Sequence, residues 1–115
     1  WLKPGVHINA VGSHRPEARE MGSDTVKAAT VVVDSLDAIN TECGDILLAL
    51  EEGAITPDHI RGEIGEVLSG AKPGRTRGDE ITMYKSVGIA AQDVAAASLV
   101  YRRALEQGVG TEGEM

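Results

Sequence analysis

The segment Thr30-Val31-Val32-Val33-Asp34 gives the clearest indication of the fold class of this 115-residue chain. Its β-branched residues follow one another without a polar interruption, which favours a strand that is buried on both faces. Such strands are typical of parallel sheets that helices cover on each side. The stretch therefore predicts an α/β fold in which residues 30–34 form a strand of a parallel sheet, buried on both faces.

Two weaker strand patterns lie on either side of this stretch, at residues 6–12 and 81–85. Helical patterns separate the three strands, and three strands that alternate with helices indicate a parallel α/β layer. Because three strands alone leave exposed edges, we expect part of a Rossmann-like, doubly wound sheet. The helices between the strands are predicted at residues 25–29, 36–41, 46–52 and 63–68, with a further helix that starts at Thr56 and is interrupted at Gly62.

A long C-terminal helix is predicted from residue 89 to about residue 107. Small and apolar residues recur along it at helical spacing, so it has one face suited to close packing against a sheet or another helix. We expect residues 111–115 to form a flexible tail. The residues of the apolar face are Ala90, Val94, Ala97, Tyr101 and Ala104.

The composition narrows the class of function. A net charge of −7 disfavours nucleic-acid and membrane partners, because an acidic surface repels phosphate groups. There is also no apolar run of about 18 residues, as a membrane span would require. A single cysteine, Cys43, excludes a disulfide framework and favours a cytoplasmic setting. No metal site is expected, because a glycine separates His59 from Glu63 and Glu66 and no other histidine stands at a matching spacing.

Several short segments occur in the order in which a known family carries them. They lie at residues 2–12 (LKPGVHINAVG), 33–35 (VDS), 42–45 (ECGD), 62–67 (GEIGEV), 74–76 (GRT), 80–88 (EITMYKSVG) and 91–93 (AQD). One such segment is a weak signal, whereas the ordered set is specific. Through them, about residues 1–110 resemble the ornithine cyclodeaminase/mu-crystallin family.

The resemblance implies a cofactor and a substrate class. Members of this family bind NAD or NADP and move a hydride at the carbon of an amino acid or cyclic imine. Residues 1–110 would be the C-terminal half of the NAD(P)-binding domain. The resemblance further implies that the chain needs the rest of the parent enzyme, is inactive alone, and belongs to a homodimer. The alternative is a non-catalytic module of the mu-crystallin type that binds a cofactor or another small molecule.

Three residues are candidates for cofactor binding. Asn9 and Val11 stand at the end of the first predicted strand, and ligands of α/β sheets bind beyond the carboxyl ends of strands. Ser86 follows the last predicted strand and precedes the long helix, whose free amides favour a polar ligand. By resemblance, Asn9 and Val11 contact the nicotinamide side of the cofactor. The alternatives are a strand-end cap for Asn9 and an ordinary helix N-cap for Ser86.

Two further residues are candidates on the substrate side. His14 occupies the position at which the family's cyclodeaminases carry an acid/base aspartate, and histidine can also move protons near neutral pH. This departure favours a ketimine reductase or amino-acid dehydrogenase over a true ornithine cyclodeaminase. Glu42 matches a substrate-side position by resemblance, and Asp45 is interpreted mainly as a helix N-cap. A solvent-facing loop histidine and a helix-end charge are the alternatives for His14 and Glu42.

Overall fold

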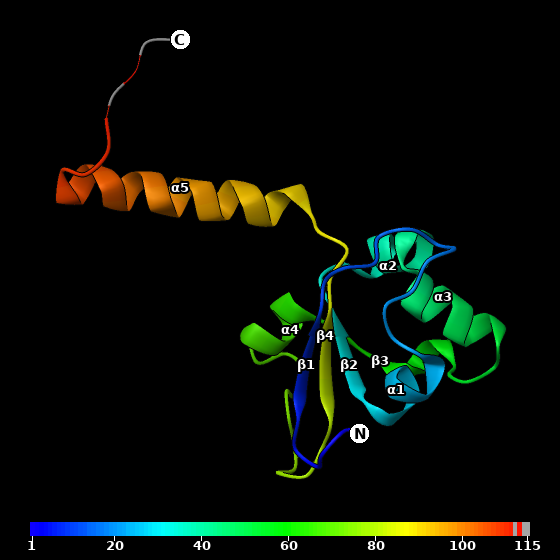
Figure 1. Cartoon of the computed structure of the whole chain (residues 1–115). Coiled ribbons are helices and arrows are strands. Elements are labelled where there is room, and N and C mark those ends of the chain that lie inside the picture. The colour runs from blue at the N-terminus through cyan, green and yellow to red at the C-terminus, as the bar shows by residue number, and fades with distance from the viewer. Residues whose placement is uncertain (112, 114–115) are drawn as a thin grey trace.

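The computed structural model describes residues 1–111 and residue 113 of the chain (Figure 1). Its centre is a parallel four-stranded sheet in the order β1-β4-β2-β3. β4, the last strand in the chain, lies between β1 and β2, so the three predicted strands are neighbours. The predicted α/β class is confirmed. The strands are β1 (His7–Ala10), β2 (Thr30–Val33), β3 (Ile60–Glu63) and β4 (Thr82–Lys85).

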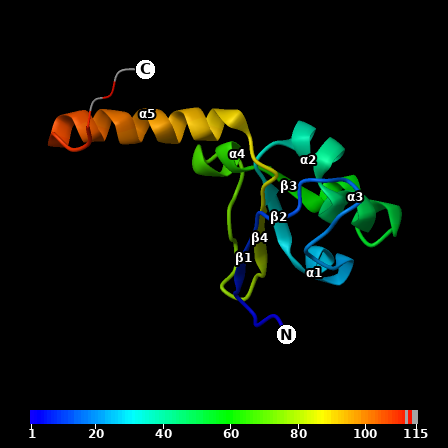
Figure 2. The same ribbon diagram turned by 45° about the horizontal axis from the view of Figure 1, so that its top comes forward.

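Helices cover the two faces of the sheet unequally, as Figures 1 and 2 show. α1 (Ser23–Ala28), α2 (Leu36–Glu42) and α3 (Gly44–Glu51) pack on one face, and the short α4 (Ile64–Leu68) lies on the other. The hydrophobic core lies between the sheet and the first three helices. Its buried residues are Ala10, Val26, Ala29, Val31, Val33, Ile39, Cys43, Ile46, Ala49, Ile55 and Met83.

The predicted burial of β2 on both faces is wrong for Val32. Val31 and Val33 are buried in the core, whereas Val32 points to the α4 side and is only partly buried. A helix of five residues covers little of a sheet face, so the outer face of β2 stays open in this chain.

The prediction of three strands is one strand short. Pro57–His59 form a single 3-10 turn, and the chain then continues as β3 and pairs with β2, where a helix was predicted up to Gly62. Proline does begin a helical turn here, as expected. The four residues of β3 include Arg61, Gly62 and Glu63, so they carry no apolar strand pattern and only pairing with β2 reveals the strand.

The long C-terminal helix, α5 (Ala90–Gln107), is confirmed, and Gly108 ends it in the left-handed conformation at a φ of 63°. Its predicted packing is not found among the described residues. α5 projects away from the sheet (Figures 1 and 2), and all of its residues except the partly buried Ala104 are exposed. The tail predicted at residues 111–115 includes residues 112, 114 and 115, which lie outside the described part. Within that part, no helix combines the length and apolar character needed to cross a membrane.

Candidate functional site

The carboxyl ends of β1 and β4 lie side by side at one edge of the sheet. Asn9 is in register with Tyr84, and the Ser86 amide donates to the Ala10 carbonyl at 3.0 Å. Asn9, Val11 and Ser86 are therefore brought together as expected. The alternative of Ser86 as an ordinary helix N-cap is wrong, because α5 begins at Ala90.

A buried carboxylate, Asp34, organises this edge of the sheet. Its Oδ2 accepts hydrogen bonds from the Ser86 hydroxyl at 2.7 Å and from the amides of Val87 at 2.9 Å and Gly88 at 2.8 Å. Its Oδ1 accepts from the Ser35 amide at 2.9 Å. Burial raises the pKa of the Asp34 carboxyl, but these hydrogen bonds lower it by more, so the net pKa lies below its ordinary value. Asp34 thus acts as an ionised acceptor that holds the turn after β4.

A second buried charge lies on the core side of the same edge. The Lys85 ammonium lies 2.8 Å from Asp45 Oδ2, and both side chains are fully buried. It also donates to the Ser13 carbonyl at 3.0 Å and contacts Glu20 Oε1 at 3.2 Å. Burial lowers the pKa of Lys85, but the hydrogen bond and charge of Asp45 raise it by more, so the ammonium stays protonated.

The prediction that Asp45 is a helix N-cap is wrong, and its side chain instead binds backbone amides of a loop. It lies inside the first turn of α3, whose N-cap is Cys43. Its Oδ1 accepts from the amides of Glu20 at 2.8 Å and Met21 at 2.7 Å, at the far end of the loop that follows β1. The near end of that loop is tied back by Glu20 Oε1, which accepts from the Gly12 amide at 2.9 Å.

This loop carries His14 and packs against the turn that follows Glu42. A Cβ atom added to Gly44 would lie 2.0 Å from the Ala18 carbonyl oxygen and 2.7 Å from that of Arg15, so only glycine allows this approach. His14 and Glu42 are both exposed and lie on these neighbouring segments. The structure therefore places both substrate-side candidates near the carboxyl edge of the sheet, and their side chains form no hydrogen bond or ion pair with each other.

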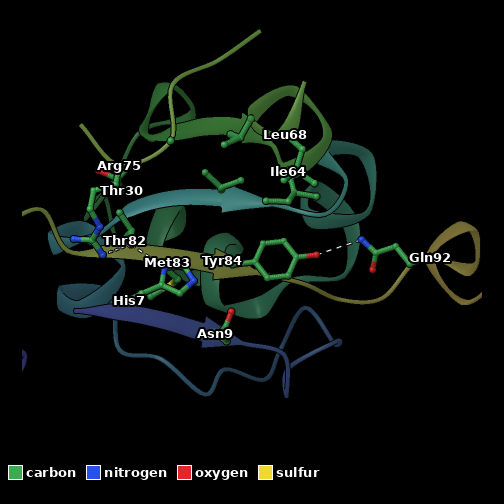
Figure 3. Close-up of a pocket in the computed structure, with 13 residues that line it drawn as sticks. His7, Asn9, Thr30, Ile64, Leu68, Arg75, Thr82, Met83, Tyr84 and Gln92 are labelled. Carbon is green, nitrogen blue, oxygen red and sulfur yellow. Dashed lines mark hydrogen bonds between the residues drawn. The ribbon is translucent and has the colours of Figure 1, made fainter. Parts of the chain in front are cut away.

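A separate open cavity of about 690 Å³ lies over the α4 side of the sheet (Figure 3). At one end Asn9 lies beside Tyr84, whose hydroxyl accepts a 3.3 Å hydrogen bond from Gln92 at the start of α5. At the other end His7 Nδ1 lies 2.8 Å from the Thr82 hydroxyl oxygen. Of the five predicted site residues, only Asn9 lines this cavity.

Sequence reasoning missed the role of Asp34 and the burial of Lys85, for which a solvated or salt-bridged side chain was predicted. The burial of Lys85 could have been predicted from the alternation of side chains along β4, which places Lys85 on the same face as the core residue Met83. A lysine on a core face must find a carboxylate, although nothing local shows which one. In residues 1–111 and 113, no group of three or more histidine, cysteine, aspartate or glutamate side chains is placed to hold a metal ion.

A parallel sheet with helices on both faces, and polar groups gathered where its strands end, defines the class of α/β domains that bind ligands at that edge. Comparison with known proteins makes the assignment specific. The ornithine cyclodeaminase/mu-crystallin family model matches residues 1–108, and the chain belongs to this family.

Two curated relatives illustrate the similarity. The Delta(1)-pyrroline-2-carboxylate reductase of Bacillus cereus is 46% identical over 114 residues, which cover 98% of this chain and 35% of that protein. The ketimine reductase mu-crystallin of Mus musculus is 46% identical over 101 residues, which cover 88% of this chain and 29% of that protein. The chain thus spans about a third of the length of these relatives.

Solved structures agree with the fold. Thermococcus litoralis Delta(1)-pyrroline-2-carboxylate reductase, in complex with NADH and L-proline, matches with a TM-score of 0.87 and 45% identity over 98% of this chain and 35% of that one. An archaeal alanine dehydrogenase dimer with bound NAD matches with a TM-score of 0.81 and 39% identity over 100% of this chain and 36% of that one.

Proposed function

We propose that residues 1–110 form the C-terminal half of the NAD(P)-binding domain of an imine reductase or amino-acid dehydrogenase. One observation carries this proposal: Asn9, Val11 and Ser86 lie on adjacent strand ends in a chain that is 46% identical to a pyrroline-2-carboxylate reductase. The substrate would be an amino acid or a cyclic imine. The chain would act together with the rest of the parent enzyme, as a cytoplasmic homodimer, and would be inactive alone.

The residues at the strand ends fit the nicotinamide end of a cofactor. Val11 is 66% exposed, and the exposed Asn9 amide makes no hydrogen bond to another residue in the described part of the chain. Both can therefore meet a carboxamide, and Ser86 lies beside them. When bound, NAD or NADP supplies the hydride acceptor or donor, and the protein's task is to orient it and exclude water.

His14 and Glu42 would act on the substrate side. A carboxylate at Glu42 would attract and orient an amino or imino group, and His14 would donate or accept a proton near the reacting carbon. The absence of the cyclodeaminase aspartate at position 14 favours reduction over cyclodeamination. Gly44 supports placing both residues on the substrate side, because it lets the loop that carries His14 pack on the turn that follows Glu42.

Turnover of Delta(1)-pyrroline-2-carboxylate with NADH or NADPH by the intact protein tests this function. Asn9→Ala and Ser86→Ala should mainly weaken cofactor binding, and His14→Ala and Glu42→Gln should mainly lower kcat or raise the KM for the imine. Asn40→Ala and Glu51→Gln are matched controls, because both side chains are exposed on α2 and α3. Cofactor binding without turnover of any cyclic imine or amino acid would favour the non-catalytic alternative.

A further inference from the structure

The Ser86 hydroxyl, at the proposed carboxamide position, already uses its proton within the protein. Its Oγ donates to Asp34 Oδ2 across 2.7 Å and accepts from the Gly88 amide at 3.2 Å. A serine hydroxyl has one proton to donate and two lone pairs with which to accept. Ser86 therefore has one lone pair left, so it can accept one hydrogen bond from a ligand but cannot donate one.

Asp34 keeps the hydroxyl in this orientation. An ionised carboxylate only accepts hydrogen bonds, and Oδ2 also accepts from the amides of Val87 and Gly88, so the carboxylate cannot turn away without losing three donors. Asp34 is 5% exposed and Ser86 is 9% exposed, which leaves water little access to the pair. The direction of the Ser86 hydroxyl is therefore set by the fold before any ligand arrives.

We propose that Asp34 is a positioning residue that turns Ser86 into an acceptor for an N–H group, and that the matching ligand group is the primary amide of a nicotinamide ring. This inference rests on the proposed function, which places Ser86 at the carboxamide. A methyl ketone at the same ring position offers an oxygen acceptor and no N–H. The site should therefore discriminate between the two groups, and this discrimination should depend on Asp34.

The test compares binding of NADH with binding of its reduced 3-acetylpyridine analogue, which carries a methyl ketone in place of the carboxamide, to the intact protein. The measured quantity is the Kd of the analogue divided by the Kd of NADH, from fluorescence titration and competition. Ser86→Ala and Asp34→Ala should each lower this ratio about two- to tenfold, the effect of one hydrogen bond. The double variant should lower it no further, because both changes remove the same interaction.

Two variants separate positioning from a general structural effect. Asp34→Asn keeps an oxygen that can accept from Ser86, so its ratio should stay near that of the wild type even if both affinities fall. Ser98→Ala is the matched serine control, because Ser98 is exposed on α5. A role in stability alone would change both affinities together and leave the ratio constant.

The outcomes are distinct. A ratio that Ser86→Ala does not change, in a protein that binds NADH, overturns the inference and leaves the proposed function standing. A ratio that falls in Ser86→Ala but not in Asp34→Ala shows that Asp34 does not orient the hydroxyl. If Asp34→Ala does not fold, the Asp34→Asn variant decides. A Kd ratio that is lowered in Ser86→Ala but stays at the wild-type value in Asp34→Asn supports the inference. A Kd ratio that is also lowered in Asp34→Asn opposes it. A wild-type protein that binds neither NADH nor NADPH overturns the proposed function itself.

Discussion

Gly44 shows how one residue holds the candidate site together. Its backbone angles suit any residue, since its φ is not positive, and the constraint is the close approach of the loop after β1. The carbonyl oxygens of Arg15 and Ala18 occupy the space that a side chain would need. The conformation of the loop that carries His14 therefore depends on the absence of a side chain at position 44.

Gly44→Ala should lower the free energy of unfolding by about 1–3 kcal/mol, the usual cost of overpacking a tight contact. It should also disturb cofactor or substrate binding through the displaced loop. Urea unfolding of the intact protein measures the first effect. Gly65→Ala is the matched control, because nothing lies within 4 Å of a Cβ atom at that position of α4 and alanine favours a helix. Equal stability of the two variants would contradict the close contact.

Glu80 is the residue from which we expect the clearest dependence of folding stability on pH. Its carboxylate accepts 2.6 Å hydrogen bonds from the Thr30 hydroxyl and the Thr76 amide and pairs with Arg61 at 3.1 Å. The hydrogen bond from Thr30 is the largest of the effects that lower the pKa of Glu80 from 4.5 to about 2. Since its folded pKa is depressed, the folded state binds fewer protons than the unfolded state between these values. This stabilisation is present above pH 4.5 and is lost as the pH falls towards 2.

Glu80→Gln should therefore have a lower Tm than the wild type near neutral pH. The difference in Tm between the two proteins should shrink as the pH falls from 4.5 towards 2. Thermal unfolding followed by circular dichroism across this range measures the gap. Glu51→Gln, at an exposed position at the end of α3, should follow the wild type throughout. A gap for Glu80→Gln that stays constant with pH would exclude the assigned hydrogen bonds.

At the scale of elements, the buried pair of Lys85 and Asp45 joins β4 to α3 and to the loop after β1. Lys85→Met should cost about 3–5 kcal/mol of stability, because it leaves the buried Asp45 carboxylate without a cation. Lys85→Met with Asp45→Leu should recover part of the loss. Lys72→Met breaks a pair with Glu66 in which both side chains are more than a third exposed, and should cost about 1 kcal/mol or less. Chemical denaturation of the wild type, the two single variants and the double variant measures these differences. Equal losses for Lys85→Met and Lys72→Met would contradict a buried Lys85 charge.

At the scale of the whole molecule, the open sheet face and α5 leave apolar surface uncovered. Val94, Tyr101 and Leu105 are each more than half exposed on α5, and a hydrogen bond from Gln92 to Tyr84 links the start of this helix to the sheet. In proteins most of the stability of a helix comes from tertiary packing of its apolar face, and α5 makes little such packing in the described residues. The apolar face predicted from the sequence therefore lacks a partner within the described residues.

Hydrogen exchange should distinguish α5 from the sheet. In the 115-residue chain alone, amides of α5 should exchange within about tenfold of the unfolded rate, and those of β2 and β4 should be strongly protected. In the longer parent enzyme proposed above, the α5 amides should become protected if α5 packs on its remaining residues. Protection of α5 equal to that of β2 in the dilute isolated chain would contradict the exposed helix.

Local patterns predicted much of the fold and the outline of the site. The runs at residues 30–34 and 81–85 predicted two strands, and the parallel arrangement placed Asn9, Val11 and Ser86 on neighbouring strand ends. β3 was missed because Arg61, Gly62 and Glu63 give it no apolar pattern of its own. The catalytic role of His14 and the substrate role of Glu42 remain predictions.

The α/β class, the parallel sheet and the long helix could be read from the sequence, because they follow from the periodicity of residues close together in the chain. The family could be read from the order of short motifs between residues 2 and 93. The pairs of buried groups became known from the folded chain alone: the Lys85 ammonium reaches the Ser13 carbonyl 72 positions away, and the Ser86 hydroxyl reaches Asp34 across 52 positions. The physical reason is that a buried lysine or hydroxyl requires a partner, but its identity depends on which distant segments the sheet brings together.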